Sequence, residues 1–518
     1  MHHTKSVVTG VATGSLLACV LLMAAFSPQA KGADAGGTPE GARITMPGPP
    51  FGVAWGFLYG CYGVKAETFL PQLREMGAGF TKLYLFWNQI EPEKGRFDWE
   101  AVDTFVGQLK SPDEALIALF SSSTWATRRP TAMLPPSPAK DPDDYYQFVH
   151  TLVSRCKGRV RYWQNDCEPN NPVFWEGTPE EFVAELKVFY RAVKDADPDA
   201  LVVCGGYDGL FNPPGMWAFP GQERGLAFFD YVLKEGADSF DVFDMRLYAD
   251  PYTIPGRVAY MRQKMAELGY EKPIICTEYN GPGFFELLEN LQYVGLAEPW
   301  TASITDADAD ARAAGAAAGT STIAALYARM DSLAPQTQMF MAGCPQQLDQ
   351  KLRRMQCRDL VMRNVLALSA GMQKTLYWDL WHDTERRDDL MHLMYAKLKL
   401  MDYEDGVLRK RYPAADALQR ITETLRGVEM VRRVEVPGRP TIYLFEVQRG
   451  QRGPVYVVWE RRDAFSGEDQ PPVAFKWEWP AAGAKATDAL GQTPPVSVAA
   501  GRLTLELSLT PIFLEPTD

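Results

Sequence analysis

Short apolar runs alternate with longer amphipathic stretches between residues 51 and 401 of the chain. In the plainest run, Leu116 to Phe120, every residue is apolar, which is typical of a strand buried on both faces. The same pattern predicts strands over 51–55, 80–86, 116–120, 160–167, 201–204, 240–247, 273–277 and 374–378.

Helical periodicity fills most of the intervals between these runs. Val102, Phe105, Val106 and Leu109 recur at the i, i+3, i+4 and i+7 spacing of a helix that buries one face. One predicted helix has a complete start signal, with Thr178 as N-cap, Pro179 in the first position and Glu181 closing a capping box. Further helices are expected over 66–76, 145–156, 226–235, 257–268 and 353–368.

Strands that alternate with helices predict a parallel sheet wrapped by helices, an α/β fold. Eight alternations within residues 51–401 favour a closed (β/α)8 TIM barrel over an open doubly wound sheet. Residues 301–322, rich in Ala, Gly, Asp and Thr, do not fit the alternation, and we expect an insertion over about 301–345, after the seventh strand, that becomes partly helical further on. A lid over the site and a plain surface excursion are both open interpretations.

The pattern changes after residue 401. Residues 402–428 predict a connecting segment with one helix. Residues 429–518 contain short β-type runs separated by turn residues, which predicts a C-terminal β-sandwich. The runs cover 441–447, 455–459, 473–479 and 503–509.

The N-terminal region is typical of a secretory signal. Lys5 precedes an apolar run from Val7 to Phe26, and Ala33-Asp34-Ala35 offers a cleavage site. We therefore expect a signal peptide over 1–35, a Gly/Pro-rich linker over 36–50, and a secreted or periplasmic protein with no membrane span after signal removal. A retained N-terminal anchor or a lipoprotein is the alternative.

Charge and cysteine content argue against some classes of function. The formal net charge of −12 argues against nucleic acid as a partner. The eight cysteines contain no CxxC pair, so we expect neither a zinc site nor a disulfide framework, and free buried thiols are favoured over a Cys344–Cys357 bridge. No metal constellation and no cofactor motif is found, and the oligomeric state is not indicated.

Two glutamates end predicted strands. Glu168 follows the run over 160–167, and Glu278 follows the run over 273–277. Carboxylates at the C-terminal ends of two strands of one barrel can face each other across its mouth, where barrel enzymes hold their active sites. Glycoside hydrolysis requires such a carboxylate pair.

Three motifs carry a resemblance to a known family: Ile90–Trp99, with its Ile-Glu-Pro and Phe-Asp-Trp groups, Glu168–Pro172, and Thr277–Glu278. Over roughly residues 45–515 the chain resembles clan A glycoside hydrolases, in particular glycoside hydrolase family 39 of β-xylosidases and α-L-iduronidases. The resemblance implies a carbohydrate substrate and retaining double displacement, with Glu168 as acid/base and Glu278 as nucleophile.

The resemblance also implies substrate-binding positions. Tyr248 matches a tyrosine that hydrogen-bonds the nucleophile, and Trp378 matches a tryptophan under the sugar. Trp87 and Trp125 are candidates for sugar stacking, with core packing equally open.

Three positions depart from the family pattern. Cys167 replaces an asparagine that binds the sugar 2-hydroxyl, Lys82 replaces an arginine, and Arg246 replaces a histidine. Arg246 would either recognise an anionic sugar or pair with Glu278. These departures keep a second hypothesis open, a catalytically inactive relative that binds glycans. A barrel of another class, such as an aldolase, would leave Glu168 and Glu278 unexplained.

Overall fold

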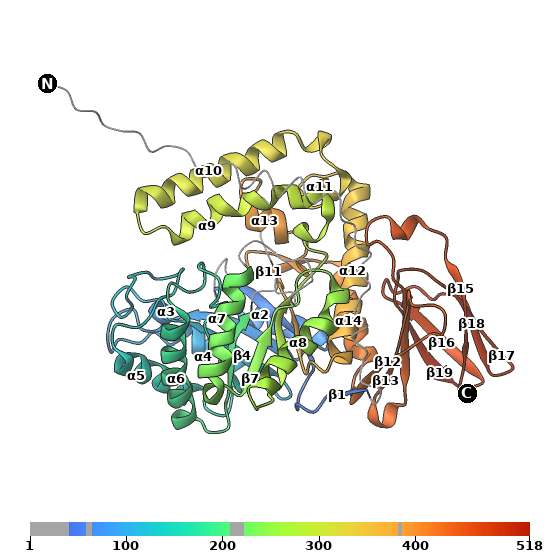
Figure 1. Ribbon diagram of the computed structural model, residues 1–518, viewed down its shortest axis with the longest axis horizontal. Coiled ribbons are helices and arrows are strands. Elements are labelled where there is room, and N and C mark those ends of the chain that lie inside the picture. The colour runs from blue at the N-terminus through green and yellow to red at the C-terminus, as the bar shows by residue number, and fades with distance from the viewer. Residues whose placement is uncertain (1–40, 59–64, 208–221, 382–385) are drawn as a thin grey trace. The chain divides into compact units, whose positions relative to one another are not determined.

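The computed structural model describes residues 41–58, 65–207, 222–381 and 386–518 (Figure 1). The predicted signal peptide over 1–35 and the first part of the predicted linker lie outside these residues. Among the helices of the described ranges, none is both long enough and apolar enough to cross a membrane.

A closed barrel of parallel strands forms the first part of the described chain, which confirms the predicted TIM barrel. The barrel closes because β2 pairs with β3 on one side and with β9 on the other. All the predicted strands are present, as β2 (Phe51–Leu58), β3 (Phe80–Phe86), β4 (Glu114–Phe120), β5 (Tyr162–Asn165), β6 (Leu201–Tyr207), β7 (Val242–Met245), β8 (Ile274–Tyr279) and β9 (Thr375–Tyr377).

Helices cover the outside of the barrel. The predicted capping box is present at the start of α6, where Thr178 and Glu181 each accept a hydrogen bond from the other's backbone N–H. Successive residues of each strand alternate between the barrel interior and the helix layer. Leu116 and Ile275, for example, face the interior. The helices of this layer are α2 (Ala66–Glu75), α3 (Trp87–Ile90), α4 (Glu100–Gln108), α5 (Pro142–Cys156), α6 (Pro179–Ala196), α7 (Gln222–Glu235), α8 (Ile254–Glu267) and α12 (Gln346–Ser369).

The insertion after β8 is more helical than predicted and begins directly after the strand rather than at residue 301. It has its own apolar core, which includes Phe284, Leu326 and Phe340. Residues 301–322 are almost entirely helical, because Asp308 caps α10 by accepting from the N–H groups of the first turn. The insertion contains α9 (Ala297–Thr305) and α10 (Ala309–Ala328), which lie side by side in Figure 1, and α11 (Pro335–Gln338), with 3-10 turns over Phe284–Glu286, Leu288–Leu296 and Met330–Ser332; α13 (Leu390–Tyr395) follows β9.

The predicted connecting segment, 402–428, contains an unforeseen hairpin of β10 (Met401–Glu404) and β11 (Val407–Arg411) before α14 (Pro413–Thr424). The C-terminal sandwich is confirmed. One sheet has the order β1-β12-β13-β14-β19-β16 and the other β15-β18-β17, and their apolar faces share one core. The strands are β1 (Ala42–Arg43), β12 (Met430–Val434), β13 (Ile442–Gln448), β14 (Val455–Glu460), β15 (Val473–Glu478), β16 (Gly483–Asp488), β17 (Val496–Ala499), β18 (Arg502–Leu507) and β19 (Ile512–Thr517).

β1 corrects the linker prediction, since two residues of the 36–50 stretch form an edge strand of the sandwich. The sandwich also contacts the barrel, because Trp459 Nε1 donates to Tyr252 Oη at 2.8 Å. The six cysteines of the described residues are free thiols, and no bridge joins Cys344 to Cys357.

Candidate active site

Glu168 and Glu278 lie together at the C-terminal end of the barrel strands. Glu278 belongs to the last residues of β8, and Glu168 follows β5. One carboxylate oxygen of each, together with Cys167 Sγ, forms a group in which all three atoms lie within 4.8 Å of one another. Glu168 is 8 % exposed and Glu278 6 %, so both carboxyls are largely removed from water.

Glu278 is surrounded by groups that stabilise its negative charge. Its Oε1 lies 2.9 Å from Lys82 Nζ and 3.1 Å from Arg246 Nη2, and it also accepts from the hydroxyl of Tyr84. The hydroxyl of Tyr248 lies 3.4 Å from Oε2. Burial alone would raise the pKa of Glu278, but Arg246, Lys82 and Tyr84 outweigh it and lower the pKa to about 2.

Arg246 is the centre of this network and is completely buried. Its Nε donates to Glu168 Oε1 at 3.2 Å, and its Nη1 donates to Asp244 and to Thr277. Gly206 on β6 leaves the necessary space, since a Cβ there would lie 2.6 Å from Arg246 Cζ. Because three carboxylates surround the guanidinium, counting Glu278, its charge is already balanced by the protein.

Cys167 occupies the position where the family that the motifs resemble has an amide. Its thiol donates to Glu278 Oε1 at 3.2 Å, and Arg246 Nη2 lies 2.8 Å from its sulfur. Burial raises the pKa of Cys167 well above its ordinary value, so the group is a neutral thiol. Cys167 therefore acts here as a weak donor to Glu278.

Three aromatic rings lie together beside the carboxylates. The ring of Tyr395, from α13, is 4.7 Å from that of Trp378 and 6.3 Å from that of Tyr248. Trp378 belongs to the cluster inside the barrel and is 7 % exposed. Arg257 fixes the backbone at Tyr248 by donating from Nη1 to its carbonyl at 2.7 Å.

The structure decides between the two open interpretations of Trp87, sugar stacking and core packing. Trp87 is completely buried in the helix-layer core, stacked on Phe148, and its indole N–H donates to Glu91 at 2.8 Å. Trp87 is therefore a core residue and cannot stack on a sugar. Trp125 is half-buried against Trp87 and donates to the carbonyl of Glu91, so its proposed role in stacking stays a prediction.

Sequence reasoning missed three residues of this network. Tyr84 stands two positions after Lys82 on β3, so strand alternation could have placed both in the barrel interior. Asp244 stands two positions before Arg246 on β7 and could have been found in the same way. Tyr395 lies on a helix after β9, and no strand pattern points to it.

Among the described residues, Cys167, Glu168 and Glu278 are close enough to share a metal ion. Their surroundings do not fit a cation, however. Lys82 and Arg246 already lie within about 3 Å of Glu278, where a metal would be repelled, and the neutral thiol of Cys167 is a poor ligand.

The whole arrangement is a buried carboxylate pair, with attendant cations and aromatic rings, at the C-terminal end of a TIM barrel. The fold is similar to that of several solved glycoside hydrolases. A family 39 glycoside hydrolase from the gut symbiont Bacteroides cellulosilyticus WH2 matches with a TM-score of 0.57 and 17 % identity, over 91 % of this chain and 81 % of that one.

Two further solved structures share the architecture. The family 51 α-L-arabinofuranosidase AbfB from Bifidobacterium longum matches with a TM-score of 0.54 and 11 % identity, over 92 % of this chain and 98 % of that one. The family 30 subfamily 8 xylanase Xyn30A from Clostridium acetobutylicum matches with a TM-score of 0.51 and 11 % identity, over 92 % and 97 %. Neither protein-family models nor curated protein sequences give a match to this chain. The resemblance inferred from the motifs is thus confirmed at the level of the fold.

Proposed function

We propose that this protein is a retaining glycoside hydrolase that acts by double displacement, with Glu278 as nucleophile and Glu168 as acid/base. The observation that carries the proposal is the approach of the two carboxyls, whose nearest ligand oxygens lie within 4.8 Å. Retaining enzymes hold their carboxyls roughly 5–5.5 Å apart, whereas inverting enzymes leave room for a water molecule between them.

The surroundings of Glu278 suit a nucleophile. A pKa of about 2 keeps the carboxylate ionised at neutral pH. Its Oε2 faces Tyr248, while Lys82, Arg246 and Tyr84 all contact Oε1. In the first step the carboxylate attacks the anomeric carbon as Glu168 donates a proton to the leaving oxygen. In the second step Glu168 takes a proton from water, which then hydrolyses the glycosyl-enzyme ester.

The charge balance of the site favours a neutral sugar. Lys82 and Arg246 supply two positive charges, and Glu278 and Asp244 supply two negative charges when Glu168 carries the catalytic proton. Arg246 is completely buried, and its guanidinium already donates to Glu168, Asp244, Thr277 and the carbonyl of Cys167, which argues against the idea that it recognises an anionic sugar. We therefore propose neutral glycosides as substrates.

The test is a screen of neutral and uronic aryl glycosides with three proteins: wild type, Glu278→Gln and Glu114→Gln. Glu114 is a matched control, because it is a partly buried glutamate paired with a lysine, Lys374, at the opposite end of the barrel. Glu278→Gln should lower kcat by about 10⁴-fold or more, as loss of a nucleophile does in other enzymes, while Glu114→Gln should keep kcat near wild type.

Glu168→Gln gives the second arm of the test. Azide should restore hydrolysis of substrates with good leaving groups and yield a glycosyl azide of retained configuration, because the small anion replaces the missing base. A product of inverted configuration from the wild-type enzyme would refute the proposed mechanism.

A second candidate function rests on Cys167 and Arg246. The thiol is a weak hydrogen-bond partner where the family has an amide, and the first catalytic step requires a neutral Glu168 beside the guanidinium of Arg246. A glycan-binding protein without turnover would fit both features. Oligosaccharide binding without release of aglycone from any substrate of the screen would favour it.

A further inference from the structure

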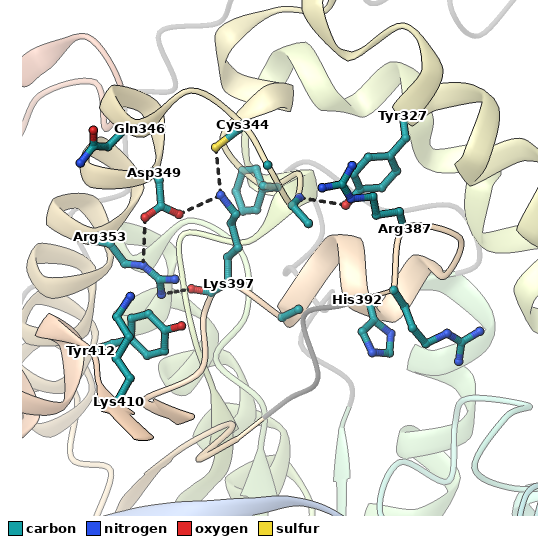
Figure 2. Close-up of a pocket in the computed structure, with 15 residues that line it drawn as sticks. Tyr327, Cys344, Gln346, Asp349, Arg353, Arg387, His392, Lys397, Lys410 and Tyr412 are labelled. Carbon is teal, nitrogen blue, oxygen red and sulfur yellow. Dashed lines mark hydrogen bonds and ion pairs between the residues drawn. The ribbon is translucent and has the colours of Figure 1, made fainter. Parts of the chain in front are cut away.

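A cavity of about 470 Å³ lies outside the barrel site (Figure 2). Tyr327 of α10, the first turns of α12 and the end of β11 contribute to its lining. Among the described lining residues there is one carboxylate, Asp349, against five permanent cations. The cations are Arg353, Arg386, Arg387, Lys397 and Lys410.

Helix α13 contributes residues to both sites. Its Tyr395 contacts Trp378 and Tyr248 of the barrel site. His392 lines the cavity, as do Ala396 and Lys397, which follow the helix. Among the described residues the charged groups that contact Glu278 are Lys82 and Arg246, so the cations of the cavity are not part of that network.

The single carboxylate organises one wall of the cavity. Asp349 Oδ1 lies 2.8 Å from Lys397 Nζ, and its Oδ2 lies 3.9 Å from Arg353 Nε. Burial opposes ionisation of Asp349, but Lys397, Arg353 and Lys410 together hold its pKa below the ordinary value. On this wall the one negative charge of Asp349 is therefore outnumbered by the three positive charges of Lys397, Arg353 and Lys410.

The opposite wall adds further positive charge. Figure 2 shows Arg387 beside Tyr327, across the cavity from Lys397 and Lys410. Arg387 lies over Gly343, where a Cβ would be 2.9 Å from its Nη2. On the wall of Lys397, the Lys410 Nζ lies 4.5 Å from the centre of the Tyr412 ring. Arg386 differs, because it pairs with Asp388 at 3.3 Å.

The N-terminal end of α12 adds to the positive electrostatic potential of the cavity. Gln346, the first residue of this 24-residue helix, lines the cavity, and Pro345 at the N-cap supplies no side-chain cap. The N-terminal end of a helix carries partial positive charge on its unbonded N–H groups. Side chains and helix end therefore both favour an anion, in a protein whose formal net charge is −12.

We propose that this cavity binds a small multivalent anion of about monosaccharide size, of the class of phosphate esters, sulfate esters or polycarboxylates. A volume of about 470 Å³ lies within the usual range of small-ligand sites. Cations on facing walls match a ligand that carries two or more negative charges, and a guanidinium such as that of Arg387 can bind an oxyanion through two parallel hydrogen bonds.

Isothermal titration calorimetry at low ionic strength tests the proposal. The probes are inorganic pyrophosphate, glucose 3,6-disulfate and citrate, each with two or more negative charges, which represent the three sources of the charge, with glucose as the neutral control. We expect at least one anionic probe to bind saturably, glucose not to bind, and added salt to weaken the binding. The probe that binds most tightly identifies the source.

The variants are Arg387→Ala and Lys410→Ala, with Arg409→Ala as matched control. Arg409 neighbours Lys410 on β11 but pairs with Glu404 and does not line the cavity. Both Arg387→Ala and Lys410→Ala should weaken binding about tenfold or more, since each removes a charged hydrogen-bond donor, while Arg409→Ala should have little effect.

The proposal is overturned if no anionic probe binds saturably, or if Arg387→Ala and Lys410→Ala bind as tightly as Arg409→Ala. Repeating the titration with Glu278→Gln separates this site from the proposed catalysis. Anion binding should be unchanged in that variant, whatever its activity.

Discussion

Two pairs of carboxyl groups are buried near the end of β5. Their neighbours shift the pKa of Glu278, in the first pair, and the pKa values of the second pair in opposite directions. Inside the barrel, Glu278 lies beside Glu168 and contacts Lys82 and Arg246, which lower its pKa to about 2. Outside the barrel, no cation among the described residues lowers the pKa of Asp166 or of Glu185 on α6. Burial raises both pKa values, that of Glu185 to about 7, and repulsion from Glu185 raises that of Asp166 further.

The difference shows that burial alone does not decide the charge of a carboxyl. Asp166 accepts from the backbone N–H of Ser121 at 3.2 Å and Glu185 accepts from that of Ala139 at 3.0 Å, and these neutral donors only partly offset burial. At Glu278 two full positive charges reverse the balance. The inner pair is built for an ionised carboxylate, and the outer pair for a carboxyl that keeps a proton.

The two pairs should also affect stability with opposite pH dependence. Glu278 has a depressed pKa, so its contribution is present above its ordinary value of 4.5 and is lost as the pH falls toward 2. Glu185 has a raised pKa, so its contribution is complete below 4.5 and is lost as the pH rises toward 7. The predictions below test this contrast.

The largest effect is expected from Lys82→Met, which makes the inner pair more like the outer one. Removing a cation 2.9 Å from Glu278 should raise its pKa, so that the acid limb of the pH profile of kcat/KM moves to higher pH. The loss of a charged donor at the nucleophile should lower kcat/KM by about 10²-fold. Steady-state kinetics over the acid pH range measures both changes.

Lys374→Met is the matched control. Lys374 is also completely buried in the barrel and pairs with a glutamate, Glu114, at 2.6 Å, but at the N-terminal end of the strands. Both variants should lose stability because each leaves a carboxylate without its lysine. An equal shift of the pH profile in Lys374→Met would mean that the effect comes from general destabilisation.

Periodicity predicted the barrel better than it predicted the segments around the barrel. The strands and the positions of Glu168 and Glu278 follow from local pattern, because strand ends and apolar runs are local features. β1 and the early start of the insertion were missed, since these segments are ordered by contacts with distant residues. The β10–β11 hairpin is local, and its Asp405-Gly406 turn is a signal that could have predicted it.

The role of each tryptophan could not be derived in the same way. Trp87 and Trp378 both follow directly on strands, yet Trp87 packs into the helix layer against Phe148, whereas Trp378 lies in the interior cluster beside Tyr395. The direction of a side chain at the first residue after a strand depends on the turn that follows. Sequence patterns contain little information on that geometry.

A change in stability is expected from Glu185→Gln, which removes the titrating group from the outer pair. The free energy of unfolding of the wild type should fall relative to that of the variant by about 3 kcal/mol as the pH rises from 4.5 to 7. Urea denaturation at several pH values measures this difference. Glu267→Gln, an exposed change on α8, should run parallel to the wild type. Parallel curves for Glu185→Gln as well would show that folding does not raise the pKa of Glu185.

The smallest effect is expected from Ser121→Ala, which removes the hydroxyl that Asp166 accepts from at 3.3 Å. Without this donor the ionised form of Asp166 is less stabilised, so the pKa values of the outer pair should rise further. The free energy of unfolding at neutral pH should fall by about 1 kcal/mol.

Ser122→Ala is the control, because Ser122 is equally buried but its hydroxyl has no hydrogen-bond partner among the described residues. Removing an unpartnered hydroxyl should leave stability unchanged or slightly raised. If both substitutions shift the urea midpoint equally and neither changes its pH dependence, the hydroxyl of Ser121 does not influence the outer pair, and burial and repulsion between Asp166 and Glu185 alone set their charge.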